Sequence, residues 1–204
     1  MSDTGVVVEY KSQSKDTQNR VPISAHVLCE KFCSASRIYS DSKETLKSLW
    51  KDVEDDPDIK VNVDNWANAI RTLYGYTPDM SLFLDHACLI CLAKIAVYLK
   101  FEKSPNRDVL LDVMKGNYFT AKGIANFLEE DLSLWLLSPE IADKSFALFC
   151  SIVDALANYD FFKIEEDLFR ELYKSSLSVT RDTKPVNTTH RNGSFNLFGM
   201  TRLP

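Results

Sequence analysis

The chain has 204 residues, of which 45% are hydrophobic and 26% charged, a composition typical of a globular protein with a substantial core. Its net charge of -5 at pH 7 excludes the general basic excess that drives strong, non-specific binding to nucleic acid. Only six glycines and seven prolines are present, which disfavours a turn-rich all-β chain and glycine-lined phosphate loops.

The first 20 residues contain one β-like run, "VVVEYK" from Val6 to Lys11, followed by a polar stretch without an apolar stripe. This pattern predicts a short extended arm and then a linker. From Pro22 onward, apolar residues recur at three- and four-residue steps, which predicts a helix that begins near this proline.

Two further helices are predicted before residue 76. The first begins near Asp41, which can cap it, and ends before "EDDPD". The second begins with Asp64 as its cap and ends at Gly75, because glycine readily adopts the left-handed conformation that stops helices.

The longest helix is predicted from Met80 to Phe101, where apolar residues occur on nearly every side. Such a helix is typical of a core axis that other helices surround. Its apolar run, "ACLICLAKIAVYLKF", is interrupted by Lys94 and is too short for a membrane span, and the N-terminus does not resemble a signal peptide. We therefore expect a cytoplasmic protein that does not enter a membrane.

The second half of the chain continues the helical pattern, and after Leu177 the periodicity disappears. We expect an all-α fold with an arm at 1–20, a helical domain at 21–176 around the central helix, and an irregular tail at 177–204. The helices predicted in this half cover about 107–114, 123–137, the stretch after Pro139 to Leu156, and 164–173.

An acidic triplet, Glu129, Glu130 and Asp131, lies inside the helix predicted at 123–137. In that register Glu130 falls between the apolar rows and faces water. Paired carboxylates act as acid and base when a cleft holds them apart, and adjacent helical positions do not converge on one substrate. The triplet is therefore interpreted as a solvated helix face.

The cysteines and histidines give the pattern closest to a metal site. Cys88 and Cys91 form a Cys-x-x-Cys next to His86, but the residues between them are apolar and helical rather than those of a zinc knuckle. Cys29 and Cys33, with His26, could in principle supply a second ligand pair. We interpret the thiols as small buried residues of a reducing compartment and predict no metal site.

The spacing of Glu9 and Lys11 matches the second half of a metal-dependent nuclease pattern, in which a carboxylate holds Mg²⁺ and a lysine polarises water. The first half, a carboxylate on an earlier strand, is missing because Asp3 lies too close in sequence. A remnant nuclease remains a second alternative. The sequence supports no catalytic triad and no phosphate-binding glycine loop, so no catalytic residue is predicted.

Four segments, read in order, resemble the helical N-terminal region of large adenine-specific DNA methyltransferases of restriction-modification systems. The similarity covers about residues 60 to 181. The segments are "NWANAIRTLYG", "LFLDHACLICLAKIAVYLKF", "GNYFTAKGIANFLEEDLSLWLL" and "ALANYDFFKIEEDLFRELYKSSL", followed by Arg181.

The resemblance implies a parent enzyme that uses S-adenosylmethionine, but this chain holds neither the Asn-Pro-Pro-Tyr/Phe motif nor a cofactor-binding glycine motif. We therefore expect no cofactor site and no methyl transfer by this chain alone. The expected function is a non-catalytic helical scaffold or DNA-contacting module of such a methyltransferase, as a fragment or as the product of a split gene.

If the module contacts DNA, the candidate residues are Lys115, Asn117, Tyr118 and Lys122, which cluster at a predicted junction between helices. The alternative is an independent helical module for protein interaction or regulation. Helical domains of this kind expose apolar patches that pair with a partner, with a second copy, or with their own tail. The expected partners are therefore a methyltransferase catalytic chain, DNA or a second copy.

Overall fold

The computed structural model describes residues 20–32, 36–102, 105–124 and 132–161, and within these ranges the chain is mostly helical. The all-α fold predicted from the sequence is confirmed. The long helices are α1 (Ala25–Phe32), α2 (Arg37–Val53), α3 (Pro57–Tyr74), α4 (Met80–Phe101) and α7 (Ala142–Leu156). The short elements are β1 (Val21–Pro22), η2 (Arg107–Val109), α5 (Leu110–Lys115), α6 (Asn117–Thr120), η3 (Leu134–Leu137) and β2 (Tyr159–Asp160).

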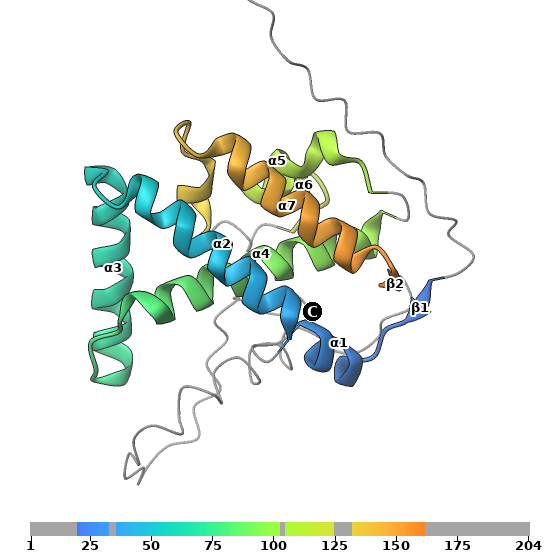
Figure 1. The fold of residues 1–204 in the computed structure, drawn as a ribbon, viewed down its shortest axis with the longest axis horizontal. Helices are drawn as coiled ribbons and strands as arrows, with labels where there is room; N and C mark the ends of the chain where they lie inside the picture. The colour runs from blue at the N-terminus through green and yellow to red at the C-terminus, as the bar shows by residue number, and fades with distance from the viewer. Residues whose placement is uncertain (1–19, 33–35, 103–104, 125–131, 162–204) are drawn as a thin grey trace, which may run out of the picture.

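Helix α4 is the central element, with the bounds that the sequence predicts. Nearly all of its residues from Leu82 to Leu99 are buried, because apolar side chains point in every direction around its axis. Helices α2 and α7 lie side by side across α4, and α5 packs against its second half (Figure 1). The predicted core axis is therefore confirmed.

By length and composition α4 could also cross a membrane, but 89% of its most apolar window is buried inside the protein. Core helices of soluble proteins share this composition, so the finding does not test the predicted localisation.

Side-chain caps set the beginnings of α2 and α3, and both differ from the prediction. Helix α2 begins earlier than expected because Ser36, not Asp41, accepts the backbone N–H of Tyr39 at 3.2 Å. Helix α3 is capped by Asp56, whose side chain accepts two backbone N–H groups, and Pro57 occupies its first turn. The predicted cap Asp64 lies inside the helix instead.

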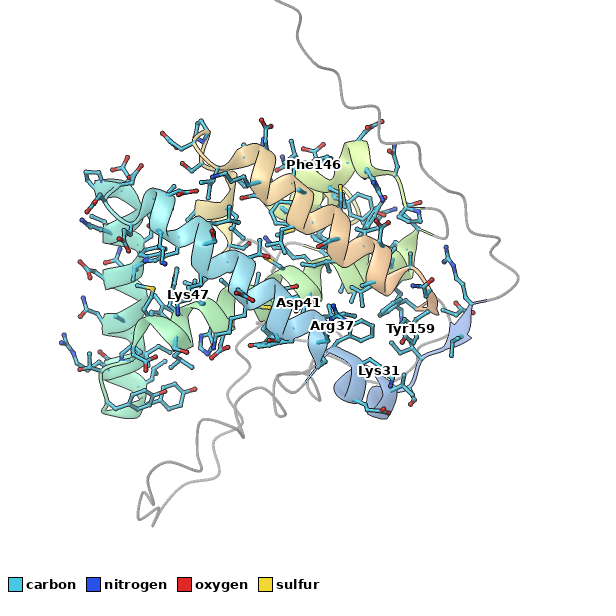
Figure 2. All side chains as sticks on the ribbon, viewed as in Figure 1. Lys31, Arg37, Asp41, Lys47, Phe146 and Tyr159 are labelled. Atoms are coloured by element: carbon cyan, nitrogen blue, oxygen red, sulfur yellow. The ribbon has the colours of Figure 1, made fainter. Side chains whose placement is uncertain are left out.

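The stop predicted for α3 is confirmed. Gly75 has a φ of 74° and its N–H bonds the carbonyl of Arg71, which closes the last turn. At the other end of the fold, the helix predicted from Pro22 begins only at Ala25. Residues Val21 and Pro22 instead pair in parallel with Tyr159 and Asp160, so β1 and β2 join the two ends of the described chain. The ring of Tyr159, which Figure 2 labels, also meets that of Phe32 on α1, edge to face with ring centroids 5.3 Å apart.

The helix predicted at 123–137 is wrong at both of its described ends. Gly123 has a φ of 78°, and Ile124 donates its N–H to the carbonyl of Phe119 at 2.9 Å, a pattern that ends a helix rather than begins one. Before Ser138 the chain forms only the short η3. The acidic triplet at 129–131 lies outside the described residues.

The other predictions for the second half have mixed outcomes. The helix after Pro139 is confirmed as α7, and the one near 107–114 as η2 and α5. The arm at 1–19, the helix at 164–173 and the tail at 177–204 lie outside the described residues. The predicted domain boundaries remain predictions.

Trp135 anchors η3 onto the core. Its ring is 7% exposed and meets those of Trp50 on α2 and Phe83 on α4, with centroids 5.6 Å and 6.3 Å away. Its indole N–H is buried without a hydrogen-bond partner among the described residues. The side chain therefore stabilises the fold through packing and not through hydrogen bonding.

We predict that Trp135→Ala lowers the free energy of unfolding by about 3 to 5 kcal/mol, because it leaves a large cavity between three elements. Trp135→Phe is the matched control: it keeps a ring in place and removes the unpaired N–H, so its cost should be less than half of that. Urea unfolding measures both. Equal costs for the two variants would contradict the packing role.

Candidate functional site

The four residues predicted to contact DNA lie where α5 meets α6. Gly116, with a φ of 83°, makes the turn between the two short helices, and such a backbone angle favours glycine. Lys115 and Asn117 flank this glycine and are exposed. Tyr118 is only partly exposed, and Lys122 lies two residues beyond the end of α6. The predicted cluster is thus one region of the surface.

Tyr118 and Lys122 do not point freely into solvent, because both contact the carboxylate of Glu102 at the end of α4. The hydroxyl of Tyr118 donates to Glu102 Oε1 at 2.6 Å. The ammonium of Lys122 lies 3.4 Å from the same oxygen. The bond from Tyr118 lowers the pKa of Glu102, and burial together with that bond raises the pKa of Tyr118.

Aromatic rings complete this arrangement. The ammonium of Lys122 lies over the ring of Tyr118 at 4.9 Å and over the ring of Phe101 at 5.5 Å, both within the range of cation–π attraction. We call Phe101, Glu102 and Tyr118 the Glu102 cage. Sequence reasoning missed Phe101 and Glu102, because they lie 16 to 21 residues before Tyr118 and Lys122 and only the turn between helices brings them together.

A buried lysine holds the neighbouring elements in place. Lys94, in the middle of α4, is 1% exposed and donates to the backbone carbonyl of Met114 at 2.5 Å. Its ammonium also lies 3.4 Å from Ser133 Oγ, just before η3. A charge inside a core requires such polar partners, so Lys94 ties α5 and η3 to the central helix.

The Cys-x-x-Cys pair lies inside α4. Cys88 and Cys91 are fully buried free thiols, and burial raises the pKa of Cys88 well above its usual value. Across the described residues, no group of three or more histidine, cysteine or acidic side chains is arranged to hold a metal ion. Cys33 and the side chains of His26 and Cys29 lie outside the description. This geometry agrees with the interpretation of the pair as buried packing residues.

His86 is a buried core histidine. The indole N–H of Trp66 on α3 donates to its Nδ1 at 3.3 Å, so a neutral imidazole carries its proton on Nε2. Nε2 is buried without a partner in the described part of the chain. Burial lowers the pKa of His86, and the nearby Asp85 opposes this effect only partly.

A second polar cluster joins α2 to the first half of α4. The hydroxyl of Tyr39 donates to Asp85 Oδ1 at 3.0 Å, and the ammonium of Lys43 lies 2.6 Å from that oxygen. Lys43 also donates to Ser81 at 3.0 Å. Each group is thus paired with another across the helix interface, and the cluster links α2 to α4.

No protein-family model, curated protein or solved structure matches this chain. The resemblance to methyltransferase helical regions therefore rests on the quoted sequence segments alone.

The burial of His86, whose Nε2 has no hydrogen-bond partner among the described residues, predicts that stability depends on pH. Because its folded pKa lies below the unfolded value, the unfolded chain takes up the proton first, and stability falls as the pH drops below about 6.5. The loss should approach about 1.4 kcal/mol per pH unit at most. Urea unfolding from about pH 8 to about pH 5.5 measures it.

The control is His86→Gln, which has no titrating ring. The advantage in stability of the wild type over this variant should shrink as the pH falls through this window. A difference that stays constant would show that His86 does not titrate with unfolding.

Proposed function

We propose that this chain is a non-catalytic helical scaffold module of a DNA restriction-modification methyltransferase, which works in the cytoplasm beside a catalytic chain that binds S-adenosylmethionine. The resemblance supports this proposal. Its segments correspond to the second half of α3, to nearly all of α4, to α6 and η3, and to the end of α7 with β2. They thus include the core axis and two residues of the Glu102 cage, Phe101 and Tyr118, whereas Glu102 itself lies just after the second segment.

An apolar corner between α3 and α4 is the observation that carries the scaffold role. We define it as Leu73, Tyr74, Tyr76 and Met80, whose exposed fractions are 55%, 49%, 49% and 36%. The rings of Tyr74 and Tyr76 lie 6.2 Å apart. Clustered apolar side chains of this size on a surface are typical of protein interfaces.

The corner arises because the apolar stripe of α3 is longer than the core beneath it. Ile59 and Ile70 of this stripe are buried, and Trp66 packs against Phe83 of α4 at 5.3 Å. Leu73 and Tyr74 continue the same stripe by one more turn but extend beyond α4. Within the described fold these two side chains contribute little burial, and a partner protein would remove them from water.

The position of the corner fits a scaffold. Helix α3 stands at one edge of the molecule, whereas β1 and β2, where the described chain begins and ends, lie at the opposite side (Figure 1). The corner thus lies at the edge of the described fold that faces away from β1 and β2, where a second protein can approach it without contacting them.

Of the four residues proposed to contact DNA, Lys115 and Asn117 are the most accessible. Lys115 and Asn117 are exposed, and Lys115 makes no ion pair within the described ranges. Lys122 is engaged by Glu102, so it can contact a phosphate only after leaving the cage. With a net charge of -5, we expect contacts that are weak and sensitive to salt.

The same corner also supports the alternative of an independent interaction or regulatory module, which pairs with an unrelated protein or with a second copy. The identity of the protein that binds the corner separates the two functions. The nuclease alternative depends on Glu9 and Lys11, which lie outside the described residues.

We predict that the wild-type protein, used as bait in an extract of its native cell, captures a chain that carries the Asn-Pro-Pro-Tyr/Phe motif. The double variant Leu73→Lys with Tyr76→Lys should lose this partner, because two charges at the centre of an apolar contact oppose burial. Its free energy of unfolding should change by no more than about 0.5 kcal/mol, since both residues are exposed. Mass spectrometry identifies the partner.

Leu111→Lys is the matched control, because Leu111 is an exposed leucine of α5 that lies outside the corner. This variant should keep the partner. Capture of an unrelated protein, or a dimer in sedimentation that the double variant abolishes, favours the independent module. Duplex DNA that fails to bind at about 50 mM salt removes the DNA-contacting part.

A further inference from the structure

The Glu102 cage brings together the groups that proteins use to recognise an alkylated ammonium ion. Two ring faces, those of Phe101 and Tyr118, lie within 5.5 Å of the ammonium of Lys122, and the carboxylate of Glu102 lies 3.4 Å from it. Ring faces attract cations through their negative potential, and a carboxylate adds a full opposite charge. The arrangement therefore already holds an ammonium group.

Two walls of the cage, Tyr118 and Glu102, have contacts that do not involve Lys122. The ring of Tyr98, itself fully buried, meets that of Tyr118 edge to face at 5.1 Å. The hydroxyl of Tyr98 is tied to the backbone of Asn106, where it accepts at 2.6 Å and donates at 3.0 Å. The bond from Tyr118 to Glu102 in turn fixes the carboxylate. The ring of Tyr118 and the carboxylate of Glu102 are thus held in place by contacts with buried parts of the protein and with each other.

Lys122 itself is held weakly. Its ion pair with Glu102 is long, at 3.4 Å, and about a third of each of the two side chains is exposed. Such surface pairs and exposed cation–π contacts contribute little each. Lys122 also belongs to the turn that Gly123 closes, outside any helix. Its side chain can leave the cage without disturbing a packed element.

We propose that the Glu102 cage is a binding site for an alkylammonium group of a ligand, and that Lys122 occupies it as an internal substitute. The ligand's cation replaces the lysine ammonium on the two ring faces and beside the carboxylate. A quaternary or methylated ammonium fits best, because its methyl groups pack on the rings while the charge is kept. This site is independent of the proposed scaffold function.

Choline and its neutral isostere 3,3-dimethyl-1-butanol test the proposal. Aromatic carbon–proton NMR spectra of the full chain report on Phe101 and Tyr118. Choline should shift these resonances in a saturable way at millimolar concentration, and the isostere should not, because it has the same shape without the charge. Equal effects of the two compounds, or no effect of choline, would overturn the proposal.

Variants of the cage test whether Lys122 competes with the ligand. Lys122→Ala should tighten the choline Kd by about fivefold, because the site no longer has to expel its own lysine. Glu102→Gln should weaken it by about fivefold through loss of the charge. Lys47→Ala, a change at an exposed lysine of α2 outside the cage, should leave the Kd unchanged.

A Lys122→Ala variant with unaltered or weaker affinity contradicts the substitution of lysine by ligand. If its thermal unfolding shows a damaged fold, Lys122→Gln keeps most of the side chain and serves the same purpose.

The ammonium can come from a polypeptide or from a small molecule, and a peptide with one trimethyl-lysine distinguishes them. Affinity for this peptide at least about tenfold above that for choline assigns the natural cation to a modified protein, since a second class of contacts is then required. Equal affinity assigns it to a small molecule. An unmodified peptide of the same sequence is the control.

Discussion

The ammonium of Lys94 is the constraint on which the rest of this structure depends. It lies in the middle of the most apolar helix, where an unpaired charge would cost several kcal/mol. The carbonyl of Met114 and the hydroxyl of Ser133 approach it, and these belong to segments that are distant in sequence. To fold, the chain must therefore bring the end of α5 and the start of η3 to one point on α4.

This constraint also organises the surface. Lys94, Tyr98, Phe101 and Glu102 follow each other at helical steps, so they share one face of α4. The contacts of that face go to the segment from Asn106 to Lys122, first through the buried ammonium, then through the hydroxyl of Tyr98, and last through the Glu102 cage. The cage is thus the exposed end of a series of polar and aromatic contacts that begins at Lys94 in the core.

Sequence reasoning succeeded where the determining signal is local. The all-round apolar pattern located α4, and a glycine in the left-handed region ended α3 at Gly75. It failed where several caps compete, since Ser36 and Asp56 start their helices ahead of the equally suitable Asp41 and Asp64. It also read "GIANFLEEDLSLWLL" as one helix, although the apolar residues near Trp135 owe their burial to η3 and to the ring of Trp50.

The sequence indicated where the four candidate residues lie, but not what two of them contact. Lys115, Asn117, Tyr118 and Lys122 share one region, as the sequence indicated, but the contacts of Tyr118 and Lys122 depend on Glu102. No local pattern reveals that a carboxylate at the end of α4 meets a tyrosine 16 residues later. The role of Lys94 was hidden for the same reason: in the sequence it only interrupts an apolar run.

Hydrogen exchange in the variant Lys94→Met tests this account most directly. Methionine keeps much of the volume but cannot donate, and replacing a buried charge by an apolar group need not lower global stability. The account predicts that amides of α5 and α6 exchange at least about tenfold faster relative to those of α2 and α7, because a short helix loses its anchor. Unchanged protection of α5 and α6 would contradict it.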